Sequence, residues 1–148
     1  MRIVEGVVSL VGNSSTQNGV TKYSVIQIGD ETLQKVKSAE SLGSYISMAL
    51  KKGGASKIHM RGKMILGVSL SDGKTFCYAP NFFGAAILTI IGLGLVGWVL
   101  SWSNIIANPF AYVIGGLGAL TLFQVYGEWL NFQAVKKLRN DGAVSISI

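Results

Sequence analysis

The 148-residue chain is poor in the side chains that build metal and redox sites, because it has one cysteine and one histidine. The single cysteine, Cys77, excludes an internal disulfide and a zinc site made of cysteine pairs. The single histidine, His59, excludes a site with several imidazole ligands. We therefore expect neither a metal site nor a cofactor, and we interpret Cys77 as a small apolar residue at the end of a strand.

Catalytic groupings are missing as well. His59 lies among lysines, so the sequence offers no Ser–His–Asp arrangement. Asp30 and Glu31 are adjacent in an expected turn, and they do not form the facing pair of carboxylates used in general acid–base chemistry. We therefore expect that the protein is not an enzyme.

The largest absence is that of charge, since residues Thr75 to Gly127 contain no Asp, Glu, Lys or Arg over 53 positions. This stretch holds two apolar segments, Phe82 to Trp102 with 21 residues and Phe110 to Tyr126 with 17. A helix of about 20 residues is about 30 Å long, which matches the hydrocarbon core of a bilayer. The segments predict two membrane-spanning helices, and the short connection Ser103 to Asn108 makes them an antiparallel hairpin.

The alternative is a buried helical hairpin in the core of a soluble protein. Aromatic side chains favour the membrane, because they gather near the segment ends, where the membrane–water interface would lie. These residues are Phe82, Phe83, Trp102, Phe110, Tyr126 and Trp129.

The positive charges predict the orientation. Ten of the 13 Lys and Arg residues precede the first apolar segment, the other three (Lys136, Lys137 and Arg139) follow the second, and the connection has none. Positively charged flanks stay on the cytoplasmic side. We therefore expect a two-span protein of the cell (inner) membrane with both termini in the cytoplasm and, since the first apolar segment begins at residue 82, no cleavable signal peptide.

The part before the apolar segments is rich in strand-forming residues. Arg2 to Val11, Thr21 to Ile28 and Thr32 to Lys37 predict three strands. Gly12 to Gly19 is polar and predicts a loop. A helix is expected from Ala39 to about Lys52, with Ser38 as its N-cap, Gly53 after its end, and one apolar face made of Leu42, Ile46 and Ala49.

Ser56 to Leu70 alternates with a period of two, which is typical of a strand with one covered face. The apolar side chains predicted to face inward are Ile58, Met60, Met64, Leu66, Val68 and Leu70. The outward row is basic and consists of Lys57, His59, Arg61 and Lys63. Gly62 predicts a bend or bulge. A tight turn at Asp72–Gly73 then predicts a return strand from Lys74 to Ala79.

Three strands, one helix and two or three further strands within residues 1–79 resemble the OB-fold, a small five-stranded barrel with a helix between its third and fourth strands. Another small barrel, or a helix packed on an antiparallel sheet, would have the same order. The fold class expected is an α+β membrane protein. Its expected domains are residues 1–79 (β-rich, cytoplasmic), 80–139 (helical hairpin with a cytoplasmic extension) and 140–148 (C-terminal strand or tail).

The C-terminal residues predict a helix and a strand. Gly127 to Arg139 contains good helix formers and continues the second apolar segment out of the membrane. Asn140–Gly142 predicts the end of that helix. Ala143 to Ile148 alternates apolar residues with serines, and we expect this strand to pair with the N-terminal domain of its own or a neighbouring subunit. A disordered tail is the alternative.

Glycines mark the apolar segments. Gly92, Gly94 and Gly97 form a G-x-G-x-x-G pattern, but a dinucleotide site would need a strand before it. In a membrane, small residues allow helices to approach closely. We expect these three glycines, together with Gly115, Gly116 and Gly118, to support a homo-oligomer; the alternative is that they only pack the two helices of one chain.

The basic row Lys57, His59, Arg61 and Lys63 is the candidate ligand-binding site. With Tyr23, Tyr45, Phe76 or Tyr78 as stacking surfaces it would suit a nucleotide or a single-stranded nucleic acid. A row of charges on a strand is more often a solvated or lipid-facing surface.

The function predicted from the sequence is a non-enzymatic membrane protein. Its cytoplasmic domain would bind or scaffold a partner, such as a cytoplasmic protein, and glycine-rich helices in the lipid bilayer would assemble it into oligomers. The first alternative is an effector or pore gated by a ligand or partner. The second is a membrane-tethered nucleotide or nucleic-acid binding module.

Overall fold

The computed structural model describes residues 1–79, 82–101 and 109–146. The fold is α+β, with an N-terminal mixed sheet that carries one helix, followed by two packed helices. The chain forms two compact units. The sheet unit combines Met1–Ala79 with Asn131–Ile148, and the helical unit is Pro80–Leu130. The domain boundaries drawn from the sequence ended the hairpin at residue 139, whereas the structure groups residues 131–139 with the sheet.

The sheet unit holds eight strands and the short helix α1. In chain order they are β1 (Arg2–Val11), β2 (Ser14–Gln17), β3 (Val20–Ile28), β4 (Glu31–Ala39), α1 (Glu40–Lys52), β5 (Ala55–Arg61), β6 (Met64–Ser69), β7 (Thr75–Tyr78) and β8 (Val144–Ile146).

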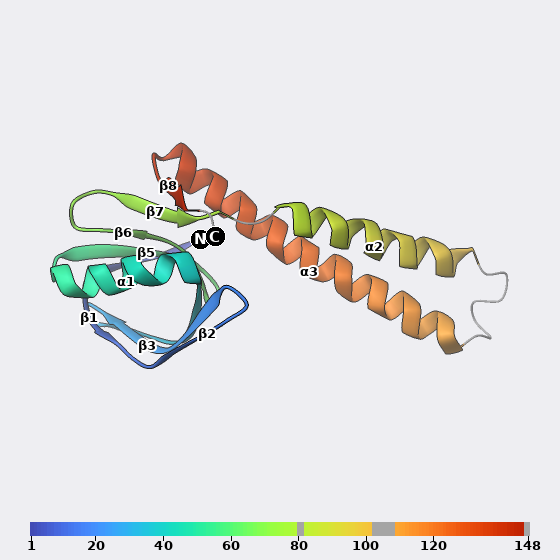
Figure 1. The fold of residues 1–148 in the computed structure, drawn as a ribbon, viewed down its shortest axis with the longest axis horizontal. Coiled ribbons are helices and arrows are strands. Elements are labelled where there is room, and N and C mark those ends of the chain that lie inside the picture. Colours follow the sequence, from blue (N-terminus) through green and yellow to red (C-terminus); the bar gives the residue numbers. More distant parts are fainter. Residues whose placement is uncertain (80–81, 102–108, 147–148) are drawn as a thin grey trace. The chain divides into compact units, whose positions relative to one another are not determined.

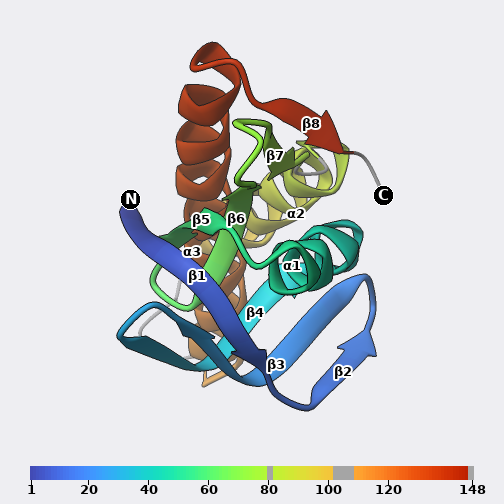
Figure 2. The same cartoon turned by 90° about the vertical axis from the view of Figure 1, so that its left-hand side faces the viewer.

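Five of these strands pair in a closed cycle (Figures 1 and 2). Strand β1 pairs with β3 and β5, β5 pairs with β6, and β4 pairs with both β3 and β6. The β4–β6 pair is parallel, with Lys37 opposite Met64 and Ser38 opposite Ile65. The other pairs of the cycle are antiparallel. The β4–β6 pair therefore closes the cycle between segments that lie on opposite sides of α1 in the sequence.

Residues 14–17 correct the sequence prediction of a loop from Gly12 to Gly19. They form strand β2, which pairs with β3 through a two-residue turn at Asn18 and Gly19. Both turn residues have positive φ, 52° and 71°, as a tight hairpin of this kind requires. The Asn–Gly pair was the signal for this hairpin, and the serines beside it concealed the strand.

The stretch from Ser56 to Leu70 is also a hairpin, so the prediction of one strand bent at Gly62 was wrong. Gly62 has φ 56° and lies in the tight turn between β5 and β6. A register shift between His59 and Met60 changes the alternation further. As a consequence, Ile65 is fully buried in the main core although it lies outside the predicted even-numbered row.

Helix α1 has the predicted apolar face and the predicted end. Leu42, Ile46 and Ala49 are buried, and Gly53 has the left-handed conformation with φ 64°. The predicted N-cap was wrong. Ala39 holds the N-cap position without a side-chain cap, while the Ser38 hydroxyl donates to the Ala39 carbonyl at 2.9 Å.

The main core contains side chains of the five cyclic strands and of α1. Most are β-branched or leucine, and burying each contributes about 1.5–3 kcal/mol. The largest fully buried members are Ile26, Ile28, Leu42, Ile46, Ile58 and Ile65.

A second cluster holds the C-terminal part of helix α3 (Pro109–Asn140) on the sheet. Val135 and Leu138 pack with Leu66 of β6 and the buried Cys77 of β7. The helix ends at Asn140, and Gly142 follows with φ 91°. Strand β8 then pairs with β7 in parallel register. The predicted helix extension, its end and the pairing of the final strand are thus confirmed for the described residues.

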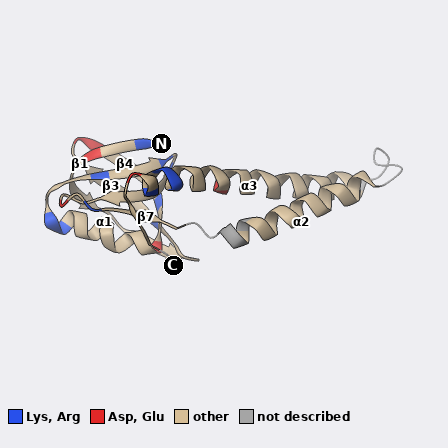
Figure 3. Cartoon of the chain, turned by 90° about the horizontal axis from the view of Figure 1, so that it is seen from above, with Lys and Arg blue, Asp and Glu red and all other residues tan. Residues whose placement is uncertain are grey.

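The helical unit contains α2 (Phe82–Leu100) and the part of α3 up to Leu130. Figure 3 shows that α2 and most of α3 carry no charged side chain. Among the described residues, one helix, Phe110–Asn140, is long and apolar enough to cross a membrane, and only 11% of its most apolar window is buried. The apolar stretch Ala86–Leu100 is shorter. Trp102 and the predicted connection Ser103–Asn108 lie outside the described residues.

Candidate functional site

Two members of the predicted basic row already have protein partners. The Lys57 ammonium pairs with the Glu5 carboxylate at 3.0 Å. The His59 Nε2 atom lies 2.8 Å from the Ser69 hydroxyl, which in turn lies 2.8 Å from the hydroxyl of Thr75. His59 therefore belongs to a hydrogen-bonded chain that crosses β5, β6 and β7.

The other two members lie where the sheet meets neighbouring segments of the same unit. Arg61 donates from Nη1 to the side-chain oxygen of Asn131 in α3 at 2.9 Å. Lys63 lies in the β5–β6 turn, and its carbonyl accepts from the Lys37 amide at 2.8 Å. The four side chains thus do not form one row, and the ligand site predicted from them stays a prediction.

His59 is 7% exposed, and its environment favours the neutral ring. Burial lowers its pKa from the ordinary value of 6.5, the charge of Lys57 lowers it further, and Asp141 opposes the shift. Among the described residues, no hydrogen-bond partner reaches its buried Nδ1 atom. Within the described residues, neither ring nitrogen of His59 is hydrogen-bonded to a carboxylate that would orient the ring for base catalysis.

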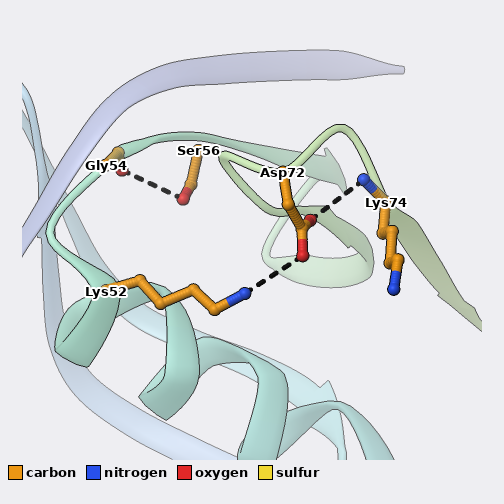
Figure 4. A network of polar contacts seen from close by, with 5 residues as sticks. All are labelled: Lys52, Gly54, Ser56, Asp72 and Lys74. Carbon is orange, nitrogen blue, oxygen red and sulfur yellow. Dashed lines mark hydrogen bonds and ion pairs between the residues drawn. The ribbon is translucent and has the colours of Figure 1, made fainter.

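The lysine at the end of α1 has a separate partner, as Figure 4 shows. The Lys52 ammonium contacts the Asp72 carboxylate at 3.0 Å, and the Lys74 amide donates to the same carboxylate at 3.1 Å. Hydrogen bonds to Lys52 and Lys74 hold the pKa of Asp72 below its usual value. This contact ties α1 to the β6–β7 turn.

The aromatic side chains proposed as stacking surfaces are occupied within the protein. Tyr45 and Phe76 stack on each other with ring centroids 4.1 Å apart. Tyr23 is 5% exposed, and burial raises the pKa of its hydroxyl, opposed in part by a hydrogen bond with Ser38. These rings therefore do not form an open platform for bases.

A different basic surface is present on β3 and β4, and we call it the lysine groove. Lys22, Lys35 and Lys37 line a groove of about 480 Å³ together with Asn13 and serines of β2 and β3. Lys22 and Lys37 are directly opposite each other in the antiparallel pair. Like charges in that position destabilise a sheet. Among the described residues, none of the three lysines forms an ion pair.

Lys35 has an unusual backbone. Its φ of 52° is in the left-handed region, which non-glycine residues adopt at a cost of about 1 kcal/mol. Strand partners are paired on either side of it, Tyr23 with Val36 and Val25 with Gln34. The lysine groove is therefore both strained and electrostatically repulsive in the absence of an anion.

Three of the predicted glycines pack within the hairpin. A Cβ atom added at Gly118 would lie 2.8 Å from Val96, and one added at Gly92 would lie 3.1 Å from Leu122. At Gly115 an added Cβ would meet Val99 at 3.8 Å. Gly92 and Gly118 thus allow α2 and α3 to approach each other closely.

The other three predicted glycines lie on the open outer sides of the two helices. Gly94 and Gly97 lie on the outer side of α2, which we call the outer glycine face, and Gly116 lies on the outer side of α3. Around Gly94, Gly97 and Gly116, an added Cβ would meet no described atom within 4 Å. Gly94 is two residues from Gly92, and Gly116 is two residues from Gly118, which places each about 200° around its helix from the packed glycine. The helices therefore have small residues on two opposite sides.

Within the described ranges, no group of three or more His, Cys, Asp and Glu residues is placed to hold a metal ion. Comparisons of the chain with models of known families, with curated proteins and with solved structures return no match.

Proposed function

We propose that this protein is a non-enzymatic membrane scaffold. Helices α2 and α3 cross the bilayer as a hairpin, the sheet unit lies at its cytoplasmic face, and the outer glycine face joins copies of the chain into an oligomer. The sheet unit presents its surface to a cytoplasmic protein partner. We also propose that the closed cycle of strands is an OB-like barrel, because its pairings and the position of α1 match that order.

The exposed apolar surface of the helices supports the membrane location. Large side chains such as Ile90, Leu100, Phe110 and Phe123 are each about 70% exposed. In water, this apolar surface would stay exposed, which is unfavourable in free energy. Lipid tails would cover it without that cost. The 19 residues of α2 span about 28 Å, close to the thickness of the hydrocarbon core.

Charge supports the orientation with both termini in the cytoplasm. The cations at the end of α3, Lys136, Lys137 and Arg139, belong to the same compact unit as the ten cations that precede α2. Keeping this unit on the cytoplasmic side satisfies the positive-inside rule at both ends of the hairpin.

The two-sided distribution of glycines is the observation that carries the assembly proposal. One set already serves the α2–α3 contact, so the outer glycine face is free to admit a helix of a second chain. Close packing of small residues is a main source of helix association in lipid.

The test is the oligomeric state of the full chain in nanodiscs, measured by mass photometry, for wild type and the variant Gly94→Leu/Gly97→Leu. We expect the wild type to be oligomeric and the variant to be smaller, with unchanged helix content. Gly118→Leu is the matched control: its side chain would clash with Val96 inside the chain, so it should lower thermal stability. A wild-type monomer, or a Gly94→Leu/Gly97→Leu variant of unchanged size, would overturn the assembly. Dye leakage from liposomes that contain the protein alone would favour the pore instead.

A further inference from the structure

We propose that the lysine groove binds the phosphate of an anionic phospholipid headgroup of the cytoplasmic leaflet. This inference rests on the proposed membrane anchor. It assigns a ligand to Lys22, Lys35 and Lys37, which the sequence did not single out as a site.

The positive charges of the groove favour the binding of an anion. Lys22 and Lys37 lie opposite each other in the paired strands β3 and β4, and Lys35 lies on β4 two residues before Lys37. None of the described residues that line the groove is acidic. A bound phosphate would turn the repulsion between the three ammonium groups into attraction, because each would lie close to a shared negative charge.

The rest of the lining suits a phosphate as well. Asn13, Ser15 and Ser24 add amide and hydroxyl groups to the same groove. Both kinds of group donate hydrogen bonds to phosphate oxygens, while the lysines act as point charges on flexible stems. The volume of about 480 Å³ is larger than one phosphate and leaves room for the polar remainder of a headgroup.

The proposed membrane anchor favours a lipid as the source of that phosphate. A chain anchored in the bilayer meets headgroups at a high effective concentration.

A nucleic acid fits these observations less well. Single-stranded nucleic acids are bound by basic grooves that also offer aromatic rings for base stacking. Tyr23 is the aromatic residue among those that line the groove, but it is only 5% exposed. Tyr45 and Phe76 do not line the groove and stack on each other. The groove therefore offers little open ring surface for base stacking.

The experiment uses the full chain in liposomes of phosphatidylcholine with a minor share of phosphatidylglycerol. After extraction in a mild non-ionic detergent, mass spectrometry counts both lipids that remain bound to the protein. The test variant is Lys22→Gln/Lys35→Gln/Lys37→Gln. The matched control, Lys51→Gln/Lys74→Gln/Lys136→Gln, loses the same charge from three exposed lysines outside the groove.

We expect phosphatidylglycerol to be enriched on the wild type and the control over its share in the liposome. Each lysine at an anionic surface contributes about a fivefold preference, so the test variant should lose at least about tenfold. Equal enrichment on the test variant, or none on the wild type, would overturn the inference. Flotation with the liposomes is measured in parallel, because failure to float would refute the membrane anchor itself.

A third arm of the experiment tests other sources of phosphate in place of the anionic lipid. The protein in phosphatidylcholine alone is titrated with inorganic phosphate and with a single-stranded oligonucleotide, and binding is followed by calorimetry. Oligonucleotide binding that depends on the three lysines, without phosphatidylglycerol enrichment, would assign the groove to nucleic acid and overturn the lipid. Weak phosphate binding that the test variant loses, together with the enrichment, supports the headgroup as the occupant.

Discussion

Leu138→Ala should release the end of α3 and β8 from the sheet. Leu138 is 3% exposed and packs in the cluster with Leu66, Cys77 and Val135. The substitution removes three buried carbon atoms, which at about 0.8 kcal/mol each amounts to about 2.4 kcal/mol. The cavity left behind raises the loss of stability to about 3 kcal/mol.

This loss of stability is large relative to the size of the cluster. Only four buried residues hold the segment in the described structure, and Leu138→Ala truncates one of them. When residues 131–146 open without unfolding of the rest, lowering the free energy of opening by about 3 kcal/mol increases the open population by about a hundredfold. The paired strands β7 and β8 should then exchange their amide hydrogens faster by the same factor.

The assay is hydrogen–deuterium exchange of the full chain in nanodiscs, read by mass spectrometry on peptides that cover β7 and β8. Lys137→Ala is the matched control, since it shortens an exposed neighbour on the same helix turn. Faster exchange is expected for Leu138→Ala only. Identical exchange in the two variants would refute the role of the cluster in docking α3 and β8.

Two further outcomes follow from the sheet unit. Lys35→Gly should raise the free energy of unfolding by about 1 kcal/mol, because glycine adopts a φ of 52° without strain and one repelling charge is removed. A lower melting temperature of this variant would contradict the inferred backbone strain at Lys35. His59 has a folded-state pKa below its ordinary value of 6.5, so the unfolded chain binds the proton more readily. Its contribution to stability is therefore present above about pH 6.5 and is lost as the pH falls below that value. The melting temperature of His59→Gln should fall less than that of wild type between about pH 7.5 and about pH 5.5, and equal slopes would contradict this.

Local patterns allowed much of the fold to be predicted. The strand-forming residues of Arg2–Val11 and Thr21–Ile28 located β1 and β3, and the spacing of Leu42, Ile46 and Ala49 located the buried face of α1. The alternation of apolar residues and serines near the C-terminus correctly predicted a strand that pairs with the sheet. Strand β2 was missed because all four of its residues are exposed, so no apolar alternation marks it.

The candidate site was less predictable, since it depends on contacts between distant parts of the chain. Lys22 and Lys37 become neighbours only when β3 pairs with β4, and Lys63 joins Lys37 only through the parallel β4–β6 pair. The hydrogen bond from Arg61 to Asn131 likewise joins residues that are 70 positions apart in the chain. The alternation of Ser56 to Leu70 indicated one basic row on one strand. The chain turns at Gly62, so Lys57, His59 and Arg61 lie on β5, whereas Lys63 lies in the turn before β6.

The sheet unit is discontinuous in the chain, because residues 131–148 complete what residues 1–79 begin. During translation, β6 and β7 are made before Val135, Leu138 and β8, which cover Leu66 and pair with the edge of β7. At about 5–20 residues per second, the roughly 60 residues between β7 and Leu138 take about 3–12 s to synthesise. Until then, Leu66 and the edge of β7 stay uncovered and accessible to chaperones and proteases.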